Sequence, residues 1–131
     1  MKLAIELPWP SADLSQNARH GSHWPRTRAI KLAREDARWL TRQAMGAQLG
    51  PQVVKIAHDG ASDIILEQVA HPPDRRGRDR DGLDSRLKAA RDGIADALQV
   101  NDRFFRPTGI QWGEPTRGGK VVVTVNLPEV R

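Results

Sequence analysis

The chain has 131 residues, of which 38% are hydrophobic, and this length predicts one domain, residues 1–131, with a single core. It contains no cysteine, which excludes disulfide bonds and thiolate metal ligands, and no apolar run long enough to span a membrane. We therefore expect a cytoplasmic protein without membrane contact, and the formal net charge of +5 favours a polyanionic partner.

The first half of the chain alternates between regular elements and turn residues. The predicted elements are a strand over residues 3–7, a polar loop over 11–23 and a helix over 26–45. Apolar residues recur every three or four positions in the helix, and Gly46 and the Gly50-Pro51 pair are expected to end it. Residues 53–56 fit either a short strand or an irregular insert.

The second half adds strands and one more helix. The predicted elements are a strand over 63–69, a helix over 83–98, a strand around 108–112 and a strand over 121–125. The Arg-Gly-Gly-Lys turn at 117–120 is typical of a hairpin that joins the last two strands. This order of elements predicts an α+β fold, in which two main helices pack on a small mixed β-sheet.

Between the strand over 63–69 and the following helix, two aspartates, Asp79 and Asp81, stand inside a run of arginines. Carboxylates at this spacing can chelate a hard divalent cation, and arginines attract phosphate, so the pairing indicates phosphodiester chemistry. The arginines of the run are Arg75, Arg76, Arg78 and Arg80. Two other interpretations stay open: a solvated loop whose charges neutralise one another, and Asp81 as the N-cap of the helix.

A third carboxylate, Asp102, follows the predicted helix and precedes a basic, aromatic segment, residues 103–106. The helix would be about 24 Å long, so Asp81 and Asp102 flank opposite ends and cannot share a metal within one straight protomer. Either the chain folds back after Leu98, or Asp102 comes from a second subunit, and we favour the second. Lys88 lies two turns after Asp81, on the same face of the helix.

These residues resemble the motifs of the RusA-type Holliday junction resolvases, which are small dimeric endonucleases common in prophages. The similar motifs are Pro-Asp-Arg-Arg at 73–76, Arg-Asp-Arg-Asp at 78–81, the helix with Lys88, and Asn101-Asp102. The opening segment 7–19 and the closing segment 111–121 are also similar, so the resemblance covers most of the chain outside residues 46–62.

The resemblance implies a RusA-like fold and a homodimeric, Mg²⁺-dependent endodeoxyribonuclease, for which Mn²⁺ could substitute. Its substrate would be the four-way (Holliday) DNA junction, cut by paired symmetric nicks in recombination and repair, and the gene would belong to a prophage. It assigns metal binding and catalysis to Asp79, Asp81 and Asp102, an active-site role to Lys88, and DNA contacts to the arginines of 75–80.

The sequence departs from the family pattern at three points. Gly82 stands where the family has Asn, Asn101 stands where it has the first of two acids, and Lys88 follows Asp81 by seven residues, where some relatives have four. The alternative is therefore a catalytically inactive or weakened branched-DNA-binding protein on the same fold. Asp84, four residues before Lys88, could also make that lysine a helix salt-bridge partner. A nuclease of another metal-dependent class and an RNA-binding module rank lower, because their usual motifs are missing.

Overall fold

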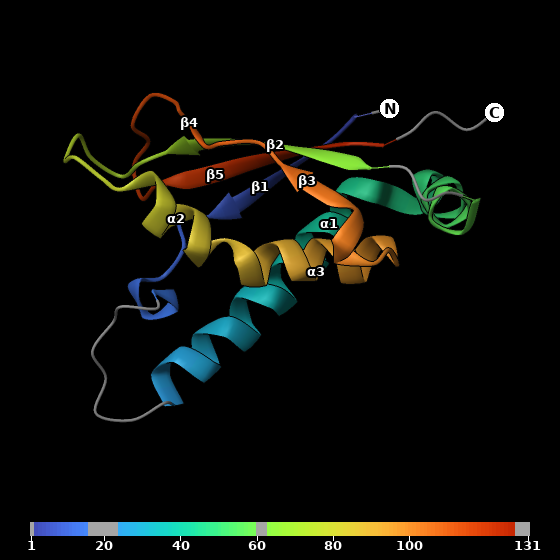
Figure 1. Cartoon of the computed structure of the whole chain (residues 1–131), viewed down its shortest axis with the longest axis horizontal. Helices are drawn as coiled ribbons and strands as arrows, with labels where there is room; N and C mark the ends of the chain where they lie inside the picture. The colour runs from blue at the N-terminus through green and yellow to red at the C-terminus, as the bar shows by residue number, and fades with distance from the viewer. Residues whose placement is uncertain (1, 16–23, 60–62, 128–131) are drawn as a thin grey trace.

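The computed structural model describes residues 2–15, 24–59 and 63–127, with the backbone alone at 24 and 47–59 (Figure 1). The segment that resembles the resolvase opening therefore lies partly outside the described residues, at positions 16–19. The elements in chain order are β1 (Lys2–Pro8), the 3₁₀ turn η1 (Ala12–Leu14), α1 (Trp24–Asp59), β2 (Ile64–His71), α2 (Arg80–Arg86), α3 (Lys88–Leu98), the 3₁₀ turn η2 (Asp102–Phe104), β3 (Phe105–Pro107), β4 (Gln111–Trp112) and β5 (Lys120–Asn126).

The β-sheet is small and mixed, as predicted. Its strands lie in the order β1-β5-β2-β3, and β4 also pairs with β2. Strand β5 is antiparallel to both of its neighbours, whereas β3 and β4 are parallel to β2. Alternate residues of β1 and β5 are buried, and Figure 1 shows that the three helices all cover one face of the sheet. The α+β class is thus confirmed, with three helices instead of two.

Helices α1 and α3 approach closely at Gly93. A Cβ atom at this position would lie 2.2 Å from the carbonyl oxygen of Arg34 and 3.0 Å from the Cβ of Ala37, so only glycine permits this contact. Next to it, Nε of Arg34 and Oδ2 of Asp96 form an ion pair at 2.6 Å. The two helices are therefore fixed relative to each other where α3 crosses α1.

The helix predicted over 26–45 ends at Gly46, as expected. Gly46 has φ 62° and ψ 175°, which is not helical backbone and is open to glycine at little steric cost, so α1 consists of two helices that meet at a kink. Residues 47–59 are again helical, so neither alternative for 53–56 is correct. Although α1 is 36 residues long, no helix in the described ranges is apolar enough to cross a membrane.

The predicted helix over 83–98 is in fact two helices, α2 and α3, which meet at Leu87. Leu87 has φ −89° and ψ −7°, and its N–H bonds to the carbonyls of Asp84 and Ser85, which ends α2. The apolar periodicity conceals this break, because Leu83, Leu87 and Ile94 all lie in the same core.

The turn before β5 is present, but the predicted hairpin is wrong. Gly118 and Gly119 have φ values of 78° and 72°, and the N–H of Gly119 bonds to the carbonyl of Thr116 at 2.7 Å. Strand β4, however, pairs in parallel with β2, because β5 occupies the position between β1 and β2. Of the strand expected around 108–112, only the last two residues form a strand, β4; β3 ends just before this range, and residues 108–110 are not in a strand.

Candidate functional site

The loop between β2 and α2, residues 72–79, is called the basic loop below. The Asp74 carboxylate accepts the backbone N–H of Arg76 at 3.0 Å and Nη2 of Arg78 at 2.8 Å. Nε of Arg76 also donates to Oδ2 of Asp74 at 3.2 Å. The backbone N–H of Arg76, its side chain and then Arg78 hold the pKa of Asp74 well below its usual range. Nη1 of Arg78 also donates to the carbonyls of Asp74 and Arg76, and the guanidinium lies 5.5 Å from the centroid of the Trp9 ring. Arg78 therefore fixes the shape of the loop.

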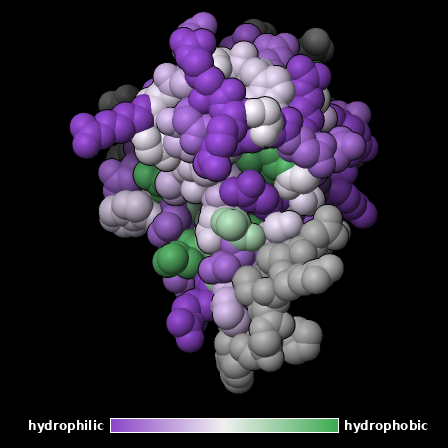
Figure 2. Space-filling model, turned by 90° about the vertical axis from the view of Figure 1, so that its left-hand side faces the viewer, coloured by the Kyte–Doolittle hydropathy of each residue, from purple (hydrophilic) through white to green (hydrophobic). Residues whose placement is uncertain are grey.

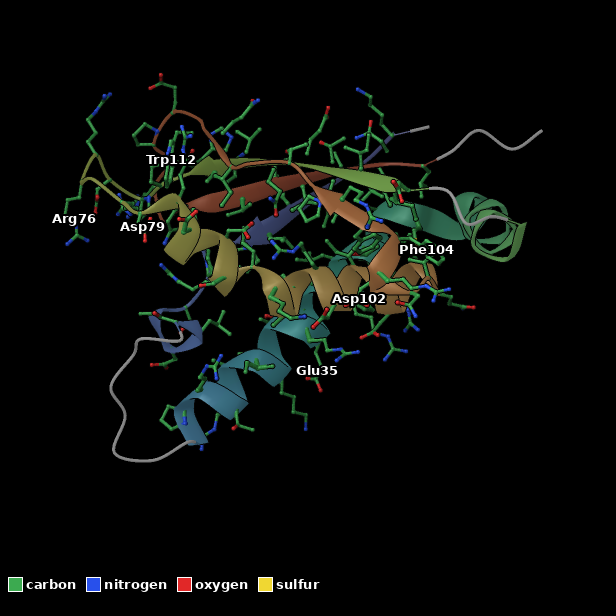
Figure 3. All side chains as sticks on the ribbon, viewed as in Figure 1. Glu35, Arg76, Asp79, Asp102, Phe104 and Trp112 are labelled. Carbon is green, nitrogen blue, oxygen red and sulfur yellow. The ribbon has the colours of Figure 1, made fainter. Side chains whose placement is uncertain are left out.

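The other three predicted DNA-binding arginines, Arg75, Arg76 and Arg80, are exposed. The Arg76 side chain is 82% exposed and points away from the body of the molecule (Figure 3). Figure 2 shows that this side of the molecule is largely hydrophilic. The structure thus presents three exposed cations close to one loop, of which Arg76 is paired through Nη2 with Oδ2 of Asp74 at 3.2 Å. Exposed guanidinium groups of this kind suit phosphate binding.

Trp112 is a candidate contact that the sequence did not reveal. It lines a hollow of about 410 Å³ together with Asp74, Arg75, Arg76 and other residues of the basic loop. Its ring is partly exposed, and Figure 3 shows it at the same end of the molecule as Arg76. Aromatic rings beside arginines suit stacking on a nucleic-acid base. The sequence did not indicate that Trp112 lies beside the basic loop, because this position depends on the β2–β4 pairing, which joins segments about 40 residues apart.

Asp79, and not Asp81, is the N-cap of α2. Its Oδ1 accepts the N–H of Asp81 at 3.2 Å and its Oδ2 accepts the N–H of Gly82 at 3.3 Å. Asp81 lies in the first turn and is exposed. The cap orients the Asp79 carboxylate and leaves lone pairs on both oxygens, so two exposed carboxylates, two residues apart, stand at the end of the basic loop.

Gly82 is tightly placed against this cap. A Cβ atom at position 82 would lie 3.3 Å from Oδ2 of Asp79, closer than most contacts of real Cβ atoms. The family's Asn at this position would therefore press on the capping carboxylate unless Asp79 shifted. Glycine and the observed Asp79 cap fit each other, which gives the departure from the family pattern a local structural reason.

Asp102 lies far from Asp79 within the chain, as expected. It is exposed in η2, beyond the end of α3, and Figure 3 shows Asp79 and Asp102 near opposite ends of the α2–α3 pair. The chain does not fold back to join them, and no three acidic or histidine side chains of the described residues are grouped for a metal. Asp102 instead lines a hollow of about 310 Å³ with Asp92, Asp96 and Arg34.

Lys88 is placed differently from the prediction. It is the first residue of α3, and its Nζ lies 3.6 Å from Oδ2 of Asp92. The break at Leu87 removes the continuous helix that would have put Lys88 and Asp81 on one face. Asp84 pairs with Arg91 at 3.2 Å, so it is not the partner of Lys88. The Lys88 side chain is 67% exposed and can still move toward a ligand.

A buried polar network under the sheet was missed from the sequence. Gln68 is 1% exposed, and its Nε2 donates to the carbonyl of Thr108 at 2.8 Å. Its Oε1 accepts Nη1 of Arg91 at 3.0 Å, and the same Nη1 lies 3.2 Å from Oδ1 of Asp84. The network ties β2 to α2 at Asp84 and to α3 at Arg91. A glutamine at an inward position of β2 was the available signal.

Arg86 supports the same region from the other side. It donates from Nη2 to the carbonyl of Pro10 and from Nε to the carbonyl of Ser11. Burial, with a smaller effect from the nearby Arg78, lowers the pKa of Arg86. These contacts hold α2 against the segment that follows β1, so both ends of α2 are fixed.

A comparison of the sequence with known proteins finds a relative of this chain. The chain is 39% identical over 123 residues to a protein from Xylella fastidiosa (strain Temecula1), and the match covers 93% of this chain and 74% of the relative. This chain belongs to the family of that Xylella protein. The Xylella protein is described as uncharacterized. No protein-family model matches the chain.

Proposed function

We propose that this protein is a metal-dependent endodeoxyribonuclease that resolves four-way DNA junctions by paired nicks. The observation that carries the proposal is the placement of two exposed carboxylates, Asp79 and Asp81, directly beside three exposed arginines at the end of the basic loop. Carboxylates hold divalent cations and arginines hold phosphates, and phosphodiester hydrolysis needs both at one place. The resemblance to the RusA-type resolvases supports the same activity.

The carboxylates fit a magnesium or manganese ion. Mg²⁺ is usually held by one or two carboxylates together with water and substrate phosphates. Asp79 and Asp81 supply two such groups from one protomer, and the cap bonds already orient the first. When bound, the ion would supply Lewis-acid polarisation of the scissile phosphate and a lowered pKa of its bound water.

The remaining residues have different roles according to their positions. Arg75, Arg76 and Arg80 hold the phosphates on either side of the scissile bond, and Trp112 stacks on a base exposed at the branch point. Lys88 stabilises the negative charge that develops during cleavage, after it exchanges Asp92 for the DNA. Because these contacts go to the backbone, recognition depends on the shape of the junction and not on its sequence.

Asp102 joins the site across a homodimer. Within one chain Asp79 and Asp102 lie near opposite ends of the α2–α3 pair, so the first alternative of the sequence analysis, folding back after Leu98, does not occur. A twofold dimer would place Asp102 of one subunit beside the carboxylates of the other, and would also provide the two equivalent sites that paired nicks require.

The test uses an immobile four-way junction and a matched linear duplex, each with Mg²⁺ or with EDTA. Wild type should nick the junction symmetrically in Mg²⁺ only. Asp81→Asn should lower the cleavage rate at least about 100-fold while junction binding persists, because it removes a ligand oxygen and no fold contact. Asp63→Asn is the matched control, because Asp63 is an exposed aspartate just before β2 whose described contact is an exposed ion pair with Arg106, and it should cleave as wild type does.

A second function follows from one possible result. If wild type binds the junction tightly but leaves it intact in both Mg²⁺ and Mn²⁺, the protein is a branched-DNA-binding protein on the same fold. The observation in its favour is Gly82, which the family replaces by Asn next to the metal-binding carboxylates. Cleavage gained by Gly82→Asn would then identify that position as the cause of the lost activity.

A further inference from the structure

The outer face of the first part of α1 is apolar and exposed. Leu32 is 57% exposed and Trp39 is 62% exposed, and they are two of the largest hydrophobic side chains on the described surface. At 100° per residue, Pro25, Leu32 and Trp39 fall within about 40° of one another. Buried Thr41 lies about 180° from Leu32, so this face lies opposite the side of α1 that packs in the core, and it borders an apolar cavity. A helix with an apolar stripe on both sides is expected to bury the outer one against a partner.

The charges on this face are arranged symmetrically about Leu32. Arg28 precedes it by four residues and Asp36 follows it by four, and both are exposed. Neither forms an ion pair with another described residue. In an antiparallel pair of α1 helices related by a twofold axis at Leu32, Arg28 of each helix lies opposite Asp36 of the other. A single surface then complements itself, which is the requirement for a symmetric dimer.

We propose that this face of α1 is the interface of a homodimer, formed by two antiparallel α1 helices that cross at Leu32. The twofold axis brings the two Leu32 side chains together and places an Arg28–Asp36 ion pair on each side of them. It also places Trp39 of each subunit opposite Pro25 of the other. The proposal names the dimer surface, and it stands without the nuclease activity.

An apolar cavity beside Leu32 provides room for the indole of Trp39 of the partner subunit. The cavity has a volume of about 370 Å³ and lies between α1, the segment after β1, and the junction of α2 with α3. Its lining includes Pro25, Ala29, Leu32 and Leu87. Aromatic side chains that enter such pockets supply much of the energy of protein interfaces, so Trp39 is the expected anchor of this dimer.

The charge pattern permits a direct test by sedimentation of the full chain, without DNA or metal. Wild type should be a dimer at micromolar concentration. Arg28→Asp places acids opposite Asp36, and Asp36→Arg places arginines opposite Arg28, so each variant should raise the dimer dissociation constant at least about tenfold. A 1:1 mixture of the two variants restores both ion pairs in the mixed dimer and should sediment as a dimer.

Two further variants test the same interface independently of the charge pattern. Trp39→Ala alters an exposed side chain and should weaken the dimer about 30-fold without loss of fold. In this cysteine-free chain, Leu32→Cys should be cross-linked between subunits by a short bismaleimide, whereas Ile65→Cys, on the opposite face of the sheet, should not. The proposal is overturned if wild type is monomeric, or if the charge variants remain dimeric alone. Junction cleavage is measured separately, so a failed interface and a failed nuclease give different results.

Discussion

The acidic residues at the two ends of the α2–α3 pair lie in different electrostatic surroundings. At the start of α2, Asp79 and Asp81 stand at the end of the basic loop, within reach of exposed arginines. Beyond the end of α3, Asp102 shares a hollow with Asp92 and Asp96, and Arg34 is bound there by Asp96. The hydrogen bonds that Arg34 donates to the Asp96 carboxylate raise the pKa of Arg34 above its usual value. The first end thus carries two acids close to exposed arginines, whereas at the second end three acids share one hollow with an arginine that is already paired.

The largest effect is expected from combining the two ends in a mixed dimer. Asp79→Asn and Asp102→Asn should each reduce junction cleavage at least about 100-fold. If each active site takes Asp79 from one subunit and Asp102 from the other, a mixed dimer has one intact site and one doubly altered site. Half of the dimers in a 1:1 mixture are mixed, so about a quarter of the wild-type nicking rate should return. If cleavage assays of the mixture show no recovery, Asp79 and Asp102 do not act together in one active site shared between subunits.

An intermediate effect is expected from the arginines of the first end. Arg75→Ala removes an exposed cation of the basic loop and no described hydrogen bond, so junction affinity should fall. The slope of log affinity against log salt concentration should become less steep by about 0.9, because one phosphate contact is lost. Lys2→Ala is the control, because Lys2 lies at the end of β1 that is away from the basic loop, and the slope should stay unchanged. Titrations of a labelled junction at several salt concentrations provide the measurement.

The smallest effect concerns the ion pair at the second end. Hydrogen bonds from Arg34 lower the pKa of Asp96, so its carboxylate stabilises the fold above the unfolded-state pKa, about 3.9, and loses this contribution as the pH falls through the lowered value. Both side chains are substantially exposed, so Asp96→Asn should cost less than about 1 kcal/mol at pH 7. Denaturant unfolding should show that the difference from wild type shrinks below pH 4. A constant difference at all pH values would mean that the charge is not responsible.

Elements with a local residue pattern could be predicted from the sequence. Features that depend on contacts between distant segments could not. The strands β1, β2 and β5 alternate buried and exposed residues, so their positions were predicted closely. The break at Leu87 was missed because its side chain stays buried and keeps the helical period intact. The hairpin before β5 was wrong because Gly118 and Gly119 specify a turn, whereas the neighbours of a strand depend on the whole sheet.

The candidate site divides in the same way. The pairing of Asp79 with Asp81 next to arginines is local, and the separation from Asp102 follows from helix length, so both could be predicted. The position of Trp112 beside the basic loop and the network around Gln68 could not, because each depends on contacts between β2 and segments 16 to 43 residues further along the chain. Residue chemistry was therefore predictable and the supporting contacts were not.

The central place of β5 in the sheet has a consequence for synthesis. Strand β1 is made first, but its only neighbour in the sheet is β5, at the other end of the sequence. Ribosomes add about 5–20 residues per second, so β1 waits roughly 6–24 s for its partner. During this interval its apolar side chains and its open edge are available to other chains. Nascent copies of this protein should therefore depend on a chaperone that shields β1 until translation has passed Asn126.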